Sequence, residues 1–291
     1  MLVYLNGHYS PVREATLSAL DRGFVFGDGV YEVWRVVRGQ MFEAERHQAR
    51  LERGLSELRI VRPEEAYLEG ITAIAERLLR ENGLVPGEAT LYVEITRGTA
   101  PRTHYFPAPG TAPTLLVMAS PFTPSEARFT GTRVITQPDV RWLRCDLKTI
   151  QLLPNVLARQ AATEVGASEA IFVRDGAITE GTHTTVFAVI GGVLRTHPAS
   201  HLVLPGVTRE VVLELARDAG LAIREAPIRV EELPNATELF LTGTTTDVTP
   251  VVRVDDRVIS GGAPGPIARS LLERLLERMG LTTSALASAR G

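Results

Sequence analysis

Residues 141–155, RWLRCDLKTIQLLPN, contain one lysine, Lys148, within an otherwise apolar stretch. The apolar residues that we expect to be buried around it are Leu147, Ile150, Leu152 and Leu153. A buried ammonium without a partner is costly, so such a lysine loses its proton, pairs with an anion or extends to water. The local pattern by itself favours an ion pair with Asp146, two residues away. The alternative is an amine kept reactive for Schiff-base formation, and other parts of the sequence must decide.

The composition is that of a soluble globular protein with a real core. The chain has 291 residues, of which 44% are hydrophobic and 22% charged, and its formal net charge is −3. Without a basic excess, nucleic acid and anionic membranes are poor partners. The start, MLVYLNGHYSPVRE, lacks a basic and apolar leader, and no apolar run reaches the ~18 residues of a membrane span, so we expect a cytoplasmic protein.

Metal and disulfide chemistry is not expected. Cys145 is the only cysteine, which excludes an intrachain disulfide and a cysteine-based zinc site. Four histidines show no metal-ligand spacing such as HExxH, so we assign them no metal: His47, His183, His197 and His201.

The first part of the chain predicts a small mixed domain. Residues 2–12 predict a β-hairpin with an Asn-Gly turn, and residues 29–42 predict a second hairpin that turns at Arg38-Gly39. The remaining signals are helical spacing in residues 43–58 and 64–84 and strand patterns in residues 89–98 and 112–122. We therefore predict an α+β domain over residues 1–120, followed by a Pro- and Thr-containing linker over residues 121–130.

Residues 131–291 predict a larger α+β domain. Its expected helices are residues 155–167, 206–221 and 265–281. Its expected strands and hairpins are residues 133–143, 169–181 with a turn at Asp175-Gly176, 184–198 with a turn at Gly191-Gly192, and 236–259. The tail, residues 282–291, is expected to be frayed.

Glu180 is a candidate partner for a heterocycle. It lies in AITEGTHTTVF, residues 177–187, where it could simply close a turn with Gly181. If the carboxylate is buried, it can instead pair with a protonated ring nitrogen. Pyridoxal phosphate requires such a partner, because a protonated pyridine ring is the better electron sink.

Two segments are candidates for an anion site. LPGVTREVV, residues 204–212, places Gly206, Val207 and Thr208 at a helix start, where free N–H groups and a hydroxyl can bind phosphate. The simpler interpretation is an ordinary helix cap. LTGTTTDVTP, residues 241–250, adds three threonines, of which Thr244 is the first, although threonine runs on exposed strands are common.

A third segment could hold a carboxylate. In TRGTAPRTHYFP, residues 96–107, Arg102 and His104 alternate on one face of an extended loop. Arginines in such Gly- and Pro-containing loops are usually solvated, so each of these signals is weak by itself. Their joint occurrence in one chain is a stronger indication.

In combination the chain resembles the class IV aminotransferases, pyridoxal-phosphate enzymes of fold type IV. The segments that match, in the order of that family, are RGFVFGDGVYEVWRV (22–36), HQARL (47–51) with its HxxRL spacing, TRGTAPRTHYFP (96–107), WLRCDLKTIQLL (142–153), ITEGTHTTVF (178–187), LPGVTREVV (204–212) and TGTTTDVTPV (242–251). Within the class, the PR-x-H loop and RWLRCD-x-K are most similar to the D-amino-acid aminotransferases.

The resemblance implies two mixed α/β domains, with an active site at the domain and dimer interface. It implies that Lys148 forms the Schiff base with pyridoxal 5′-phosphate and moves the substrate proton, and that Glu180 holds the pyridine nitrogen protonated. The residues implied for the cofactor phosphate are Arg50, Val207, Thr208 and Thr244. The residues implied for the substrate α-carboxylate are Tyr31, Arg102 and His104, with the trap completed by a neighbouring subunit, hence a homodimer.

The implied reaction is the transfer of an amino group from a D-amino acid to a 2-oxo acid, such as D-alanine with 2-oxoglutarate. Three departures from the family pattern affect the surroundings of the cofactor: threonines and His183 replace serines and an asparagine after Glu180, Gly243 replaces a serine, and Pro154 replaces a glycine. The alternatives are a branched-chain L-aminotransferase, an R-selective amine transaminase, aminodeoxychorismate lyase and a non-catalytic relative. An intact lysine, glutamate and phosphate arginine argue against the last.

Overall fold

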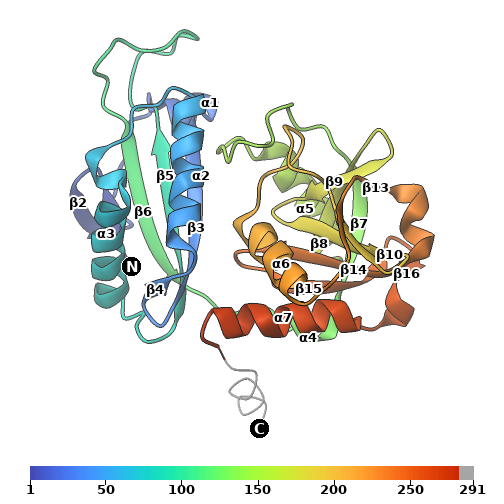
Figure 1. The fold of residues 1–291 in the computed structure, drawn as a ribbon. Helices are drawn as coiled ribbons and strands as arrows, with labels where there is room; N and C mark the ends of the chain where they lie inside the picture. Colours follow the sequence, from blue (N-terminus) through green and yellow to red (C-terminus); the bar gives the residue numbers. More distant parts are fainter. Residues whose placement is uncertain (282–291) are drawn as a thin grey trace. The chain divides into compact units, whose positions relative to one another are not determined.

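The computed structural model describes residues 1–281, which fold as two compact units (Figure 1). Unit 1 comprises residues 1–123 and 147–152, and unit 2 comprises residues 124–146 and the chain from residue 153 onward. The segment 147–152, which carries Lys148, therefore packs with unit 1 although it lies between two segments of unit 2. The tail for which fraying was expected, residues 282–291, lies outside the described residues.

Unit 1 is built on a six-stranded antiparallel sheet with the order β2-β1-β6-β5-β3-β4. Its strands are β1 (Leu2–Leu5), β2 (His8–Pro11), β3 (Gly29–Val37), β4 (Gln40–Met41), β5 (Glu88–Thr96) and β6 (Thr114–Pro121). Its helices are α1 (Arg22–Phe26), α2 (Ala44–Glu57), the short η1 (Glu64–Ala66) and α3 (Leu68–Glu81). Both predicted hairpins are present, and their turns place Asn6 and Arg38 at positive φ, each followed by a glycine.

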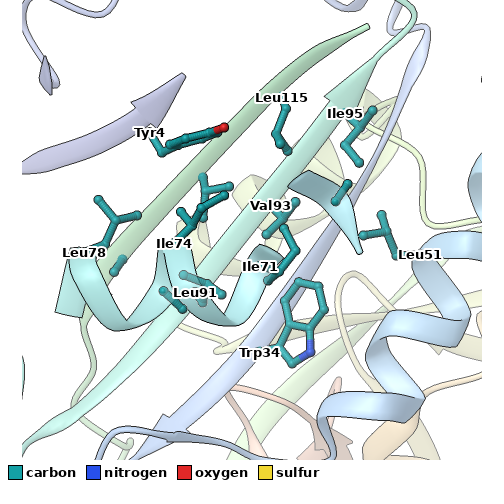
Figure 2. Packing of buried hydrophobic residues seen from close by; sticks show 14 of the residues in the cluster. Tyr4, Trp34, Leu51, Ile71, Ile74, Leu78, Leu91, Val93, Ile95 and Leu115 are labelled. Atoms are coloured by element: carbon teal, nitrogen blue, oxygen red, sulfur yellow. The ribbon is translucent and has the colours of Figure 1, made fainter. Parts of the chain in front are cut away.

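The core of unit 1 lies between the sheet and helices α2 and α3. Alternate residues of β3 and β5, such as Trp34 and Val93, are fully buried on this face, where Leu51 of α2 and Ile71 of α3 meet them (Figure 2). The helices supply apolar residues at the three- and four-residue spacing of an amphipathic helix. Since β3 alternates, Tyr31 lies on the opposite face of the sheet from Trp34.

Unit 2 contains a ten-stranded mixed sheet. The main path is β12-β11-β10-β14-β15-β7-β8-β9-β13, and β16 pairs with β15. The strands are β7 (Thr132–Pro138), β8 (Glu169–Arg174), β9 (Ala177–Gly181), β10 (Thr185–Ile190), β11 (Val193–Thr196), β12 (Ile223–Glu225), β13 (Ile228–Arg229), β14 (Ala236–Gly243), β15 (Asp247–Val254) and β16 (Arg257–Val258). Its helices are α4 (Ala127–Thr130), α5 (Leu153–Glu164), α6 (Val207–Asp218), η2 (Val230–Asn235), η3 (Ser260–Gly262) and α7 (Pro266–Arg278).

The strand register of unit 2 places polar residues at one end of a buried sheet. Val186 and Leu241 lie in the apolar core cluster, whereas Phe187 stacks on Phe240 on the other face, with ring centroids 5.1 Å apart. Thr185 and Thr242 continue that second face toward the strand ends, where they are paired directly and buried. The sheet therefore ends in hydroxyl groups rather than in apolar side chains.

Two local expectations need correction or refinement. Leu153, the first residue of α5, is exposed rather than buried. Leu147 alone of the four apolar neighbours of Lys148 is buried. The predicted linker contains the short helix α4, whose Arg128 is buried and donates to Asp247 at 2.8 Å. Among the described residues, no helix is long and apolar enough to cross a membrane.

Candidate functional site

Lys148 lies at the end of strand β3. The backbone N–H of Tyr31 donates to the carbonyl oxygen of Lys148 at 3.0 Å, and Ile150 N–H donates to Gly29 at 3.2 Å. The Lys148 Nζ is 4.1 Å from the centroid of the Tyr31 ring. The backbone pairing thus fixes a half-buried amine over an aromatic face.

The same residue stands out in the composition. Of the 31 basic residues, 30 are arginines, and Lys148 is the only lysine of the chain. An arginine remains protonated and is a poor nucleophile, whereas a lysine amine can lose its proton and attack a carbonyl. The lone lysine is a signal for reactivity that the local pattern of apolar neighbours does not contain.

Arg50 of α2 is held by a buried carboxylate. Its Nε is 2.8 Å from Glu32 Oε2 and its Nη2 is 2.7 Å from Glu32 Oε1. His47, one turn earlier on α2, places Nδ1 3.0 Å from Glu32 Oε1. Burial by itself raises the pKa of Glu32, yet Arg50 and His47 hold it well below its ordinary value. Burial lowers the pKa of His47.

Glu32 and His47 were not predicted as site residues, although the sequence contains part of the signal. The HxxRL spacing puts His47 and Arg50 on one face of a helix. Nothing in the sequence says that Glu32, on the helix-facing side of β3, would meet them. That contact depends on how α2 packs on the sheet.

Arg102 and His104 both lie near the same aromatic ring. Both flank Phe26 of α1: the Arg102 guanidinium is 5.3 Å and the His104 ring 5.7 Å from its ring centroid. Both side chains are exposed. The loop beneath them is anchored by Arg22, which donates to the Thr103 carbonyl at 2.8 Å.

The anchor belongs to a buried arginine–aspartate–arginine group that the sequence analysis did not identify. Asp28 accepts from Arg22 at 2.8 Å and from Arg97 at 2.8 and 2.9 Å. Burial raises the pKa of Asp28, but the two guanidinium groups bring it below its ordinary value. Arg97 also packs on the ring of Phe106, farther along the same loop. Two cations on one carboxylate thereby fix both ends of the segment that presents Arg102 and His104.

Glu180 is the next-to-last residue of strand β9 in unit 2 and is buried. Its Oε1 accepts from Arg141, and its Oε2 accepts from the backbone N–H of Leu204 at 3.0 Å. Burial raises the pKa of Glu180 above its ordinary value, and Arg141 only partly offsets this. A carboxylate of raised proton affinity is a strong acceptor for a ring N–H. Arg141, the first residue of the RWLRCD segment, is the residue that orients Glu180, a role that the sequence did not indicate.

Of the residues predicted to hold a phosphate, Val207 and Thr208 begin helix α6, whereas Thr244 follows strand β14. No side chain caps this helix within the described chain: Gly206 is its N-cap, and Val207 and Thr208 follow it, both buried. A Cβ on Gly206 would lie 3.0 Å from Thr185 Oγ1, so glycine allows the close approach of that hydroxyl. Thr244 begins the turn between β14 and β15 and is half-buried.

The start of α6 has the properties of a phosphate site. A helix N-terminus presents N–H groups and the positive end of the dipole to an anion. Next to it, Thr242 Oγ1 is buried and has no hydrogen-bond partner among the described residues, although its cross-strand neighbour is Thr185. An uncapped helix with an unsatisfied hydroxyl beside it is what a phosphate would complete. No group of histidine, cysteine, aspartate and glutamate in the described chain could hold a metal ion.

The comparisons with known proteins agree on one family. A family model described as amino-transferase class IV matches residues 29–254. The D-alanine aminotransferase of Bacillus licheniformis is 39% identical over 274 residues, 93% of this chain and 94% of the relative. That of Staphylococcus haemolyticus is 37% identical over 273 residues, covering 93% and 95%.

Solved structures of the same fold include branched-chain aminotransferases. The Escherichia coli branched-chain amino acid aminotransferase has a TM-score of 0.87 at 22% identity and covers 97% of this chain and 95% of its own. The T.th. branched-chain amino acid aminotransferase, complexed with N-(5′-phosphopyridoxyl)-L-glutamate, has a TM-score of 0.84 at 27% identity, covering 98% and 96%.

The chain belongs to the class IV aminotransferases. It is an aminotransferase with the two-sheet α+β fold of fold type IV, as the sequence predicted, and its cofactor is pyridoxal 5′-phosphate. Lys148, the buried Glu180 and the uncapped start of α6 are groups of the kinds that this cofactor requires.

Proposed function

We propose that the protein transfers amino groups from D-amino acids to 2-oxo acids, with D-alanine and 2-oxoglutarate as representative substrates. The observation that supports this most strongly is the 36–39% identity to D-alanine aminotransferases over more than nine-tenths of the chain. The side-by-side placement of Arg102 and His104 at Phe26 supports it independently, because two basic side chains on one loop suit a carboxylate.

The proposed division of labour assigns each protein group one task. Lys148 Nζ would hold the cofactor covalently and, once freed by the substrate amine, would move the proton between the substrate Cα and the C4′ carbon of the cofactor. Glu180 keeps a proton on the ring nitrogen, and Arg141 keeps Glu180 in place. When bound, pyridoxal phosphate accepts the electrons of the bond broken at Cα and carries the amino group between the two half-reactions.

The phosphate is assigned to Arg50 and to the helix start with Val207, Thr208 and Thr244. Arg50 suits the task because Glu32 already fixes the plane of its guanidinium, so little conformational entropy is lost on binding. Tyr31, Arg102 and His104 are assigned to the substrate α-carboxylate. Fixing that carboxylate decides which Cα–H bond stands perpendicular to the cofactor ring and therefore which enantiomer reacts.

A homodimer is part of the proposal. Helix α5 presents an apolar stripe in which Leu153, Val156 and Leu157 are 68%, 59% and 62% exposed, at helical spacing on one face. Such stripes are typical of protein–protein contacts. Leu157→Glu should shift the protein toward the monomer in analytical ultracentrifugation, with Ser270→Glu at an exposed position of α7 as the control. The domain boundaries at residues 120 and 131 and a cytoplasmic location stay predictions.

The cofactor part is tested on Lys148. Because no other lysine exists in the chain, borohydride treatment of the native enzyme should add one cofactor mass, mapped by peptide mass spectrometry to the peptide with Lys148. Lys148→Ala should still bind the cofactor, but without a covalent bond, so that dialysis removes it. Its transamination rate should fall by at least about 10²-fold, the usual contribution of a positioned acid–base group. Cofactor attached elsewhere would refute the assignment.

The substrate part is tested with a panel of amino donors: both enantiomers of alanine, glutamate and leucine, and R-phenylethylamine. We expect activity with the D-amino acids. The second candidate is a branched-chain L-aminotransferase, which the T.th. structure at 27% identity favours. Activity confined to L-leucine would select that candidate and reject the D-amino-acid proposal.

A further inference from the structure

Glu169, the first residue of strand β8, is a buried carboxylate that has no role in the chemistry described above. It accepts a hydrogen bond from the hydroxyl of Thr182 and one from Thr184 at 3.2 Å. It also accepts from the Ala170 N–H at 2.8 Å and lies 2.8 Å from His183 Nδ1. Three consecutive residues of the segment after Glu180 are therefore attached to one carboxylate.

The backbone of this segment is fixed as well. Gly181 N–H donates to the Thr184 carbonyl at 2.7 Å, which closes a tight turn. Asn155 of α5 donates to the Thr182 carbonyl at 2.7 Å. A Cβ on Gly181 would lie 2.0 Å from Thr184 Oγ1, so the turn accepts only glycine there. We call residues 181–185 the threonine turn.

The threonine turn reaches both segments assigned to the cofactor phosphate. The His183 carbonyl oxygen lies 3.4 Å from the position that a Cβ would take on Gly243, next to Thr244. At the other end, Thr185 Oγ1 lies 3.0 Å from the Cβ position of Gly206, the N-cap of α6. A Cβ at Gly243 would meet the turn at ordinary van der Waals distance and would lie closest, at 3.2 Å, to Thr246 Oγ1 of its own loop.

We propose that Glu169 is a positioning residue for the cofactor: it fixes the threonine turn, and the turn sets the spacing between the start of α6 and the β14–β15 loop. The proposal rests on the assignment of the phosphate to these two segments. Glu169 itself does not touch the phosphate. Its effect passes through Thr182 and Thr184, whose hydroxyls it orients, to Thr185 and the His183 carbonyl.

The role requires a carboxylate. Glu169 accepts from two hydroxyls, a backbone N–H and His183, with Arg159 Nη1 3.7 Å away. An amide keeps only one accepting oxygen and turns its NH₂ group toward other donors. Glu169→Gln therefore leaves buried donors unsatisfied and loosens the turn.

The test compares two buried carboxylates of the same unit. Glu238 accepts from the N–H groups of Ile267 and Ala268 at the start of α7, so Glu238→Gln also breaks buried hydrogen bonds but at another place. Each variant is stripped of cofactor and titrated with pyridoxal phosphate, and separately with inorganic phosphate while unfolding is followed. We expect Glu169→Gln to lower the affinity for both ligands by about tenfold or more. Glu238→Gln should leave both affinities within about twofold of those of the native chain.

A second pair keeps the test decisive if Glu169→Gln fails to fold. Thr184→Val removes the hydroxyl at constant shape and should weaken phosphate binding, whereas Thr184→Ser should retain it. Equal phosphate affinity in Thr184→Val and the native chain would overturn the proposal. The underlying site assignment is tested separately by Thr208→Val: if this change does not weaken phosphate binding, the assignment fails, whatever Glu169 does.

Discussion

The guanidinium of Arg50 and the carboxylate of Glu32 form a two-pronged ion pair, with Nε 2.8 Å from Oε2 and Nη2 2.7 Å from Oε1. The pair joins α2 to β3 on the buried side of the sheet, and Glu32 is fully buried. This contact fixes the direction in which the planar guanidinium of a flexible arginine side chain donates its hydrogen bonds.

Glu32→Gln should weaken pyridoxal phosphate binding and destabilise the fold. Removing one partner of a buried ion pair leaves the other charge uncompensated and costs about 3–5 kcal/mol. Chemical denaturation of the apo and holo forms measures both effects. Glu88→Gln, which removes the half-buried partner of Arg35 at the far end of β3, is the control. It should change cofactor affinity little, and equal losses of affinity in both variants would contradict the assigned role of Arg50.

The stability of unit 1 should fall on the acid side of the pH range. The pKa of Glu32 and that of Asp28 lie below their ordinary values of 4.5 and 3.8 in the folded chain. The unfolded chain therefore binds more protons as the pH drops, so the stabilisation is fully present above these ordinary values and is lost as the pH falls below them. Urea unfolding between about pH 7 and pH 3 measures the slope, and Asp28→Asn should make that slope shallower. An unchanged slope would mean that Asp28 is not held ionised by Arg22 and Arg97.

Arg102→Ala should impair substrates with an α-carboxylate selectively. A charge-assisted hydrogen bond contributes about 1.5–3 kcal/mol, which corresponds to roughly a 10- to 100-fold lower kcat/KM for D-alanine and D-glutamate. Any basal activity with R-phenylethylamine, which has no carboxylate, should remain. Arg59→Ala, which removes an arginine that packs on Phe106 of the same loop, is the control. Unchanged kinetics with D-glutamate would remove Arg102 from the site.

Glu180→Gln should lower kcat more than it raises the KM of the amino donor. The carboxylate of Glu180 holds a proton on the ring nitrogen of the cofactor, whereas the amide of the variant is a much weaker acceptor. The ring then withdraws electrons less well, while the contacts to the substrate remain. We expect a loss of about 10²-fold or more, measured in single-turnover experiments that follow the cofactor spectrum. Arg141→Lys should show a smaller loss of the same kind, since lysine retains the charge but not the geometry that orients Glu180. A pure KM effect would place Glu180 in substrate binding instead.

Much of the fold could be predicted because its signals are local. The Asn6-Gly7, Asp175-Gly176 and Gly191-Gly192 turns carry their own backbone preference, since these residues adopt positive φ at low cost. The helices follow from apolar spacing. The assignment of the site residues stays a prediction: it rests on the resemblance and, for Val207 and Thr208, on their place at a helix start.

The residues that orient the site were not predictable in this way. Arg141 meets Glu180 across 39 residues of sequence, and Glu32 meets Arg50 across 18, because strands and helices pack side by side in space. No periodicity encodes such a pairing. The exposure of Leu153 was mispredicted for the same reason: hydrophobicity says that a residue favours burial, and only the direction of α5 says what it faces.

By itself the sequence determined the family, through motifs in family order from about residue 21 to residue 251, and it singled out Lys148, the one lysine among 31 basic residues, as the candidate reactive group. Covalent reactivity is a property of residue type, which the sequence states directly. Only the tertiary structure decided how the groups are held: Lys148 against β3, Arg50 on Glu32, Glu180 on Arg141 and the threonine turn on Glu169. The orientation of a charged or hydroxyl group depends on its hydrogen-bond partners, and these come from distant parts of the chain.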